Sequence, residues 1–266
     1  MSVHEEIREQ QKKLKGQGFK AHWDYFWEYY KIHTLVVVCV IILLATLIRD
    51  VKDNKPYAFY AVAINSTASA AQDILEKEFA EYSGINTEEY DCYIDTTQTY
   101  NLQIIDEMTI ATSQKIMANM AASELDVMMA DSTVFTHYAN QETFLDLRTV
   151  LSSSELSELS GRLVYVDQAY LDFLNSEEYQ HYISTGEFDA ENKYAVMADA
   201  YNKDFTMPTT DPTEMQNPIP VGIKVDDSAA LANVGAYDGA SPVVGIVINT
   251  KHTEVSKQFL WYLLGK

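Results

Sequence analysis

An uncharged apolar run near the amino terminus constrains this chain more than any other feature. No Asp, Glu, Lys or Arg occurs from residue 32 to residue 48. At about 1.5 Å per residue, such a helix spans roughly 25 Å, and one more turn back to Tyr29 reaches the ~30 Å hydrocarbon core of a bilayer. Val and Ile are poor helix formers in water, but in lipid a single crossing segment must be helical to satisfy its backbone. We therefore predict a transmembrane helix over residues 32–48.

The residues before this run suit a membrane–water interface, where aromatic rings and Lys are common. The aromatic residues of this flank, which Lys31 follows, are Trp23, Tyr25, Phe26, Trp27, Tyr29 and Tyr30. A buried helix of a soluble core rarely has so one-sided an aromatic flank. A cleaved signal peptide is the stronger alternative, but 31 residues precede the run and no Ala-x-Ala site follows it. We therefore expect a retained anchor with the lipid bilayer as partner of residues 32–48.

Charge gives the expected orientation. Six Lys and Arg occur in the first 31 residues and three at positions 49, 52 and 55, which favours a cytoplasmic amino terminus. From Tyr57 to the end, 32 Asp and Glu stand against 10 Lys and Arg, so nucleic acid would be repelled and is not expected as a partner. We predict a single-pass cell-membrane protein with a cytoplasmic juxtamembrane segment over 1–31, a linker over 49–56 and an extracytoplasmic domain over 57–266.

Strand and helix patterns alternate in the predicted outer domain. β-rich apolar runs at residues 57–65, 89–96 and 125–131 are each followed by a helical pattern, the second of which predicts one long helix over 102–123. Two further strands are expected at 218–225 and 241–250, and a closing amphipathic helix follows them. This order predicts an α/β fold with a mostly parallel sheet flanked by helices.

The region from about 152 to 211 is less regular, and we interpret it as an insert. It begins with a short capped helix and a candidate strand at 162–167. A helix is expected over 168–184, and a polar tract rich in turn residues follows it.

Two stretches resemble type 2 extracellular solute-binding proteins of ABC transporters. They are "LDVMMADSTVFTHYANQETFLDLRTVL" and "SPVVGIVINTKHTEVSKQFLWYLLG". The spacing of "YAFYAVAIN" and the helix expected after it fits the first strand of that family. The resemblance implies one lobe of a periplasmic binding protein-like II fold. Members of that family hold a ligand between two lobes, but only about seventy residues separate Leu147 from Pro218, too few for a complete second lobe. The chain thus looks like a membrane-anchored, truncated variant that has the first lobe only.

Candidate ligand-binding residues follow the predicted strands. In an open parallel sheet, ligands bind beyond the carboxyl ends of the strands, where helix amino termini offer free N–H groups. The residues at these positions are Asn65, Ser66, Thr67, Thr96, Thr97, Asp131 and Ser132. The alternative for the Ser, Thr and Asp residues is that they only cap helices.

Tyrosines are frequent in the predicted insert. We consider Tyr170, Tyr179 and Tyr182 candidates for a partner surface, because aromatic side chains on an exposed patch suit a protein or a sugar. The alternative is that they pack the insert onto the lobe.

The sequence offers little evidence for catalysis or metal binding. His-Glu-x-x-His, Gly-x-Ser-x-Gly, the phosphate-binding Gly-x-x-x-x-Gly-Lys and Cys-x-x-Cys are absent. The two cysteines, Cys39 and Cys92, fall in different predicted compartments and cannot form a disulfide within one domain. We therefore predict no catalytic residues, no metal site and no cofactor.

The predicted function is a membrane-anchored extracytoplasmic binding or interaction module, accessory to a transporter or other membrane complex and able to take a small solute. Two alternatives stay open. One is a membrane-tethered hydrolase with an unidentified nucleophile, and the other is a purely structural assembly subunit.

Overall fold

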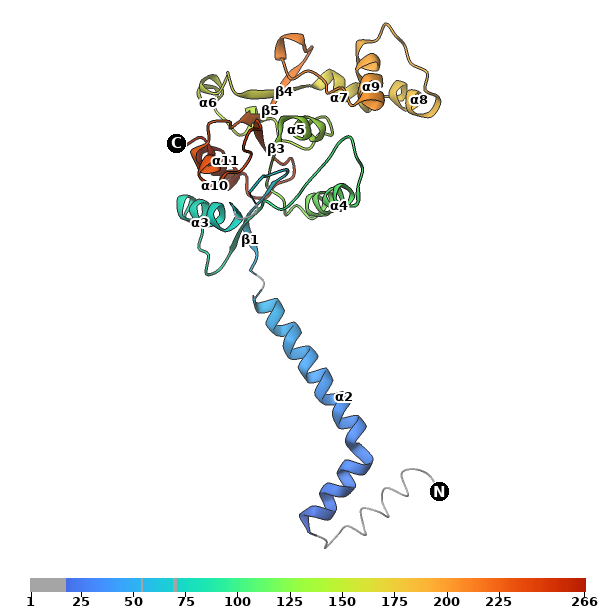
Figure 1. The fold of residues 1–266 in the computed structure, drawn as a ribbon, viewed down its shortest axis with the longest axis vertical. Coiled ribbons are helices and arrows are strands. Elements are labelled where there is room, and N and C mark those ends of the chain that lie inside the picture. Colours follow the sequence, from blue (N-terminus) through green and yellow to red (C-terminus); the bar gives the residue numbers. More distant parts are fainter. Residues whose placement is uncertain (1–17, 54, 69–70) are drawn as a thin grey trace. The chain divides into compact units, whose positions relative to one another are not determined.

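The computed structural model describes residues 18–53, 55–68 and 71–266 (Figure 1). The chain divides into two compact units, one ending at Lys55 and the other running from Pro56 to Lys266. Each unit is described by itself below.

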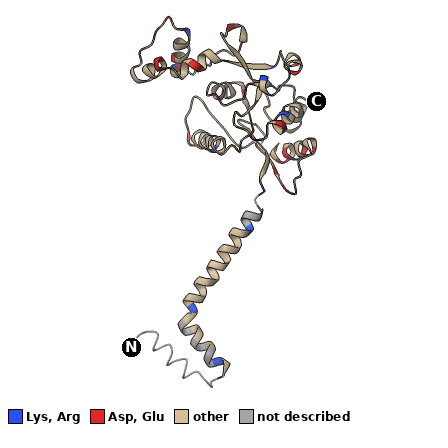
Figure 2. Cartoon of the chain, turned by 180° about the vertical axis from the view of Figure 1, so that it is seen from behind, with Lys and Arg blue, Asp and Glu red and all other residues tan. Residues whose placement is uncertain are grey.

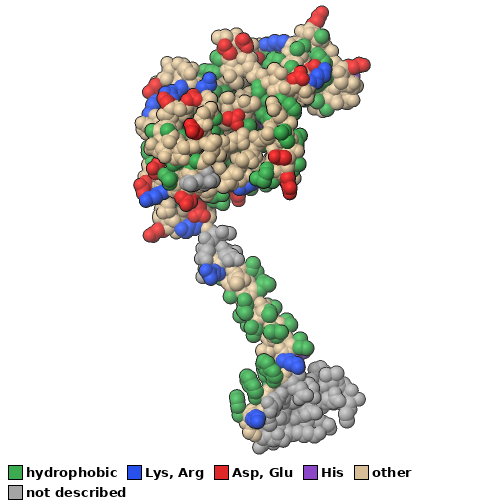
Figure 3. Space-filling model, viewed as in Figure 1, with side chains coloured by type: hydrophobic (Ala, Val, Ile, Leu, Met, Phe, Trp, Pro, Cys, Tyr) green, Lys and Arg blue, Asp and Glu red, His purple; other side chains and the backbone are tan. Residues whose placement is uncertain are grey.

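The first unit contains one long helix, α2 (Phe19–Asp53). Its stretch from Tyr30 to Arg49 is long and apolar enough to cross a bilayer, and none of it is buried by other parts of the chain. Apolar side chains run along the face of this stretch that Figure 3 shows, which suits contact with lipid. The prediction of an apolar, membrane-competent helix is confirmed at this level of length and composition.

The aromatic residues before the apolar stretch lie on the same helix. Trp23 and Trp27 are stacked one turn apart, with ring centroids 6.3 Å from each other, and Phe26 and Tyr30 are stacked at 5.9 Å. Their i, i+4 spacing places each pair on one side of the helix. The aromatic flank is therefore a regular part of α2.

The second unit is built on a six-stranded sheet with the order β2-β1-β3-β6-β5-β4. The strands are β1 (Tyr57–Ala63), β2 (Asp91–Asp95), β3 (Val127–Asp131), β4 (Leu163–Asp167), β5 (Pro218–Lys224) and β6 (Pro242–Ile246). β1 pairs in parallel with β2 and β3, whereas the pairs β3–β6, β6–β5 and β5–β4 are antiparallel. Four strands therefore share one direction, and the predicted mostly parallel α/β sheet is confirmed, although every pairing that does not involve β1 is antiparallel.

Nine α-helices belong to the described part of this unit. They are α3 (Ala71–Ser83), α4 (Glu107–Ala121), α5 (Ser132–Ala139), α6 (Ser153–Glu158), α7 (Gln168–Leu174), α8 (Glu177–Thr185), α9 (Lys193–Asp204), α10 (Ala229–Val234) and α11 (Thr253–Leu263). Acidic side chains are spread over these helices, as Figure 2 shows, and the apolar part of α2 carries none.

The sheet separates two hydrophobic cores, because successive residues of a strand point to opposite faces. Phe59 of β1 packs on one face with Phe79 of α3 and Phe259 of α11, at centroid distances of 4.7 and 4.9 Å. Its neighbour Tyr60 belongs to the core on the other face, with Ile116 of α4. Helices therefore cover both faces of the sheet.

Two strand glycines let α5 approach the second face closely. A Cβ atom added to Gly222 of β5 would lie 2.5 Å from the Phe135 ring, and one added to Gly245 of β6 would lie 2.8 Å from the Phe144 ring. Such contacts are too short for any side chain. The two rings stack on each other over these glycines, with centroids 4.3 Å apart, and so fix α5 on the sheet.

The insert is smaller than predicted. α6 and β4 belong to the main body, since Leu159 is in the first core and β4 forms one edge of the sheet. The remaining part, which we call the helical insert, comprises α7, α8, α9 and the loop to residue 217 (Figure 1). It has a small core of its own, formed by Tyr170, Phe173, Ala195 and Ala198.

Several predicted helix limits were wrong for local reasons. The long helix begins at Glu107 because the Asp106 side chain caps it by accepting a hydrogen bond from the Thr109 N–H at 2.8 Å. The helix predicted over 168–184 is two helices, because Ser176 caps a new one through the Tyr179 N–H. α9 and α10 were not predicted.

Candidate functional site

The carboxyl ends of β1 and β3 bring two predicted residues together. The Asn65 side-chain amide donates to Asp131 Oδ2 at 2.9 Å and to the Tyr100 carbonyl at 3.0 Å, and its oxygen accepts from the Tyr100 N–H at 2.8 Å. Asn65 has a φ of 60°, the left-handed conformation that Asn tolerates better than most residues. Asp131 Oδ1 also caps α5 by accepting from the Thr133 and Val134 N–H groups. The pair fastens β1, β3 and the Tyr100 loop to one another.

The neighbouring predicted residues have mainly structural contacts. Thr67 donates to the Gly235 carbonyl at 2.8 Å and accepts from the Asp238 N–H at 3.2 Å. Ser132 is the first residue of α5, and its carbonyl accepts from the Thr136 hydroxyl at 2.7 Å. The Ser66 hydroxyl is buried and has no hydrogen-bond partner among the residues that the structure describes.

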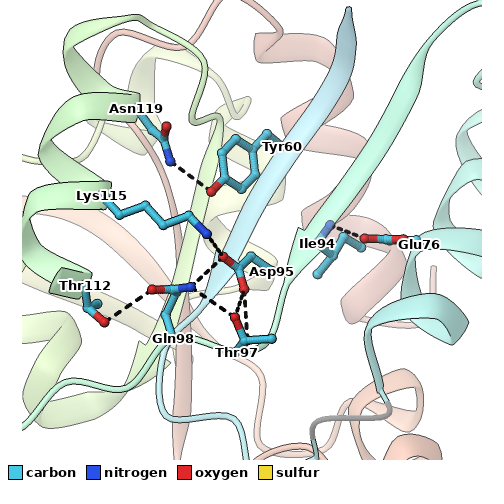
Figure 4. Close-up of polar contacts among 9 residues, drawn as sticks. All are labelled: Tyr60, Glu76, Ile94, Asp95, Thr97, Gln98, Thr112, Lys115 and Asn119. Carbon is cyan, nitrogen blue, oxygen red and sulfur yellow. Dashed lines mark hydrogen bonds and ion pairs between the residues drawn. The ribbon is translucent and has the colours of Figure 1, made fainter. Parts of the chain in front are cut away.

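The end of β2 is organised around a buried carboxylate, Asp95 (Figure 4). It accepts from Lys115 Nζ at 2.6 Å, from the Thr97 N–H and hydroxyl, and from the Gln98 side chain at 2.8 Å. Burial alone would raise the pKa of Asp95, but the hydrogen bonds from Lys115 and Thr97 hold it below its ordinary value. The predicted Thr97 thus serves this network, which ties α4 to β2. The predicted Thr96 is buried, and its hydroxyl has no partner within the described part of the chain.

The outer side of β2 has a further polar contact. The Ile94 N–H donates to Glu76 Oε1 of α3 at 3.0 Å, and Figure 4 shows this bond on the opposite side of β2 from Lys115. β2 is an edge strand, so a side chain here takes the place of a neighbouring strand.

A cavity of about 210 Å³ lies between α5 and the helical insert. The chain segment at the end of α5 contributes His137, Asn140 and Gln141. The helical insert contributes Tyr170, Leu174, Tyr179, Tyr201 and Pro208. An adjoining cavity of about 130 Å³ shares Asn140, Tyr170 and Pro208 and adds the charged residues Asp167, Lys193 and Glu214. We call the two cavities together the tyrosine pocket.

His137 is the central polar group of the larger cavity. Burial lowers its pKa to about 4, so the ring is neutral at pH 7. Its Nε2 accepts from the Gln141 side-chain amide at 2.8 Å and from the Tyr100 hydroxyl at 3.1 Å, so Nδ1 carries the proton and donates to the Tyr201 hydroxyl oxygen. Burial also raises the pKa of Tyr201 to about 12. The Tyr201 O–H proton is therefore retained and free to be donated into the cavity.

Tyr170 is the least explained polar group of the pocket. Its side chain is only 2% exposed, it lines both cavities, and its hydroxyl has no hydrogen-bond partner among the described residues. Burial raises the pKa of Tyr170, which keeps the hydroxyl protonated. A tyrosine without a hydrogen-bond partner among the described residues therefore lies where the two cavities adjoin.

The tyrosines predicted to form a partner surface lie mostly inside the helical insert. Tyr170 is buried, and so is Tyr182, whose hydroxyl donates to Asp199 Oδ1 at 3.0 Å. Tyr179 is half-buried and lines the larger cavity. The insert has few large aliphatic side chains, so aromatic rings fill its core instead. Tyr170 and Tyr182 therefore fit the alternative, in which tyrosines pack inside the protein, better than they fit an exposed partner surface.

The smaller cavity is bordered by a firmly held carboxylate. Asp167 at the end of β4 accepts from the Gln216 and Asn217 N–H groups, both at 2.9 Å, and from the Tyr194 hydroxyl at 2.8 Å. Burial would raise the pKa of Asp167, but these hydrogen bonds keep it below the ordinary value. The Lys193 ammonium lies 4.0 Å away. Asp167 is therefore ionised at neutral pH.

A second histidine network lies at the opposite ends of the strands. Asp126, which precedes β3 and is fully buried, faces His252 Nδ1 with both oxygens at 3.1 Å. It also accepts from the Tyr60 N–H at 2.9 Å and from the Thr250 hydroxyl. These bonds join the start of α11 to the sheet. The only hydroxyls bonded to histidine rings in the described chain are those of Tyr100 and Tyr201, so the hydrolase alternative gains no nucleophile from them.

Sequence reasoning missed most of this pocket. The predicted site residues do not include His137, Asn140, Gln141 or Tyr201. The density of tyrosine in the insert was the one available signal, and it indicated a surface instead of a cavity. Within the described ranges, no three His, Cys, Asp or Glu side chains are placed to hold a metal ion.

Comparison of the chain with protein-family models, with curated proteins and with solved structures gave no match. The resemblance to solute-binding proteins therefore stays a prediction.

Proposed function

We propose that this chain is a membrane-anchored extracytoplasmic binding module that takes up a small solute in the tyrosine pocket. The observation that carries the proposal is Tyr170, a nearly buried residue that lines both cavities and whose hydroxyl has no hydrogen-bond partner in the described chain. A tyrosine hydroxyl can donate one hydrogen bond and accept others. A bound solute that accepts this hydrogen bond would give the hydroxyl a partner.

The lining supports a binding role. Ligand pockets combine apolar and aromatic walls with a few polar groups that converge on the ligand. Here Leu174 and Pro208 are apolar, Tyr201 offers a donor, and the amides of Asn140 and Gln141 border the same space. About 210 Å³ is small beside the 300–1,000 Å³ usual for drug-sized ligands, which favours a small solute.

The position of the pocket is compatible with the resemblance to a single solute-binding lobe. That family holds its ligand between two lobes, and in this chain the cavity lies between the sheet-bearing body and the much smaller helical insert. We propose that the insert takes the role of a reduced second lobe.

The apolar helix supports the anchoring part of the proposal. The stretch from Tyr30 to Arg49 would cross the cell membrane, with the amino terminus in the cytoplasm because more Lys and Arg precede the span than follow it. The second unit would then work outside, as an accessory to a transporter or other membrane complex. Protease protection of tagged termini in intact cells tests this orientation, and a protected carboxyl terminus would contradict it.

The binding role is tested on the full chain in lipid nanodiscs. Thermal unfolding is measured with a panel of sugars, amino acids, organic cations and carboxylates. A solute at 100 times its Kd should stabilise the protein by about 2.7 kcal/mol. At least one class should raise the melting temperature of the wild type.

Two tryptophan variants connect this response to the pocket. Leu174→Trp fills the larger cavity, and Ile183→Trp adds similar bulk at an exposed position of α8 outside it. We expect only Leu174→Trp to lose the response. If no class stabilises the wild type, or if both variants respond equally, the pocket is not a binding site.

A further inference from the structure

We propose that the tyrosine pocket selects a small organic cation with an alkylammonium group. The inference rests on the proposed binding function and adds the chemical class of the solute. Three features of the described residues point to it: the aromatic wall, the electrical state of the lining and the charge around the pocket.

The aromatic wall gives a cation its contacts. Tyr170, Tyr179 and Tyr201 line the larger cavity, and the face of a tyrosine ring attracts a cation within about 6 Å of its centroid. The helical insert already contains one such contact at the smaller cavity, where Lys193 Nζ lies 4.5 Å from the centroid of the Tyr194 ring. Tyrosine faces of this insert therefore do hold an ammonium group.

The larger cavity has no Lys or Arg in its lining that would oppose a cation. The His137 ring is neutral, and the tyrosines and amides around it are neutral as well. An anion, by contrast, would find only Lys193, which is already near Asp167 and over Tyr194. A buried anion without a paired cation is strongly disfavoured. The lining thus discriminates against carboxylates and phosphates.

The charge around the pocket favours a cation over a neutral solute of the same shape. The smaller cavity has two carboxylates, Asp167 and Glu214, against the single ammonium of Lys193. Beyond it, the chain from Tyr57 onward carries 32 acidic and 10 basic residues. A field of this sign raises the local concentration of cations and speeds their association. A sugar would gain hydrogen bonds in the pocket but nothing from this field.

The test compares choline with neohexyl alcohol, its uncharged carbon isostere, by calorimetry on the full chain in nanodiscs. Both probes have the same shape, so any difference in affinity comes from charge. We expect choline to bind at least about tenfold more tightly. Raising the salt concentration should weaken the binding of choline but not that of the isostere.

Three variants locate the effect. Tyr179→Leu removes a ring from the wall and should lower choline affinity about tenfold, whereas Tyr179→Phe keeps the ring and should stay within about threefold of the wild type. Glu214→Gln should lower the affinity for choline and leave the affinity for neohexyl alcohol unchanged. Tyr90→Leu, at an exposed tyrosine outside the pocket, is the matched control and should change nothing.

The outcomes separate this inference from the proposed function. Equal affinity for choline and neohexyl alcohol, or a response in the solute panel to sugars or carboxylates and not to cations, would overturn the cation assignment and leave the pocket as a binding site. Equal losses for Tyr179→Leu and Tyr179→Phe would show that the hydroxyl matters instead of the ring face. Loss of binding for every class would overturn both proposals.

Discussion

The sheet-bearing body and the helical insert are built in different ways. The body has two cores on opposite faces of a six-stranded sheet, with aromatic and aliphatic side chains such as Phe59 and Met128 fully buried. The insert has a core of four buried residues, two of them alanines, with half-buried rings around it. Because stability follows buried apolar area, the insert should open locally at a lower free energy than the body. The tyrosine pocket thus has one firm wall and one more easily displaced wall.

Removing a central ring of the body should have the largest effect. Phe59 is fully buried against Phe79 and Phe259, and Phe59→Ala should lower the free energy of unfolding by about 3–5 kcal/mol. Urea unfolding followed by circular dichroism measures the change. Phe205→Ala, at a position that is 40% exposed, is the control and should cost far less. Similar losses for both variants would contradict the assignment of the core.

Removing a ring of the insert should act locally. Phe173 belongs to the core of the insert. Phe173→Ala should lower the free energy of local unfolding of α7, α8 and α9 by about 3 kcal/mol. Hydrogen exchange should speed up over residues 168–217 and stay slow in β1 and β3. Equal acceleration in the sheet would show that body and insert unfold as one unit.

Acidification should weaken the contact between the two regions through His137. Its pKa is about 4 in the folded chain and near the ordinary 6.5 when unfolded, so between these values the unfolded chain binds more protons. Stability is thus fully present above pH 6.5 and declines as the pH falls toward 4, by on the order of 2–3 kcal/mol. The carboxylates Asp95 and Asp167, whose pKa values are lowered, lose their contributions only below about 3.8.

The matched variant for this pH effect is His137→Gln. It keeps hydrogen-bonding groups near Tyr201 and cannot titrate, so the slope of stability between pH 6.5 and 4 should largely disappear. Urea unfolding at half-unit pH intervals measures the slope. If His137→Gln keeps the full dependence of stability on pH, then other titratable groups cause that dependence.

The smallest effect concerns the break between α7 and α8. The Ser176 hydroxyl accepts from the Tyr179 N–H at 3.2 Å and donates to the Phe173 carbonyl at 2.6 Å. Ser176→Ala should cost about 1 kcal/mol, seen as faster exchange at the start of α8. Ser184→Ala, an exposed serine that only bonds the His181 carbonyl, should be close to neutral. If Ser176→Ala and Ser184→Ala change stability equally, the Ser176 cap does not maintain the break between α7 and α8.

The sequence predicted the body better than the insert, for reasons seen in particular residues. Short β-rich runs in the sequence identified all six strands, and the Asp131 cap marked the start of α5. By contrast, α9 buries only Ala195 and Ala198, so it has no stripe of large apolar residues to reveal it, and α10 is six residues long. The pocket combines His137 with Tyr170 and Tyr201, which tertiary packing alone brings together. Asn65 and Asp131 could be placed side by side because parallel strands end at the same side of a sheet.

The hydrogen bond between Glu76 and the Ile94 N–H has a consequence for the proposed membrane anchoring. Many copies in one bilayer would meet often and in similar orientations, and an exposed strand N–H is where their sheets could join. With this donor occupied by a carboxylate, a neighbouring copy gains little by aligning there and also meets negative charge. Crowding in the membrane plane would then leave each molecule separate.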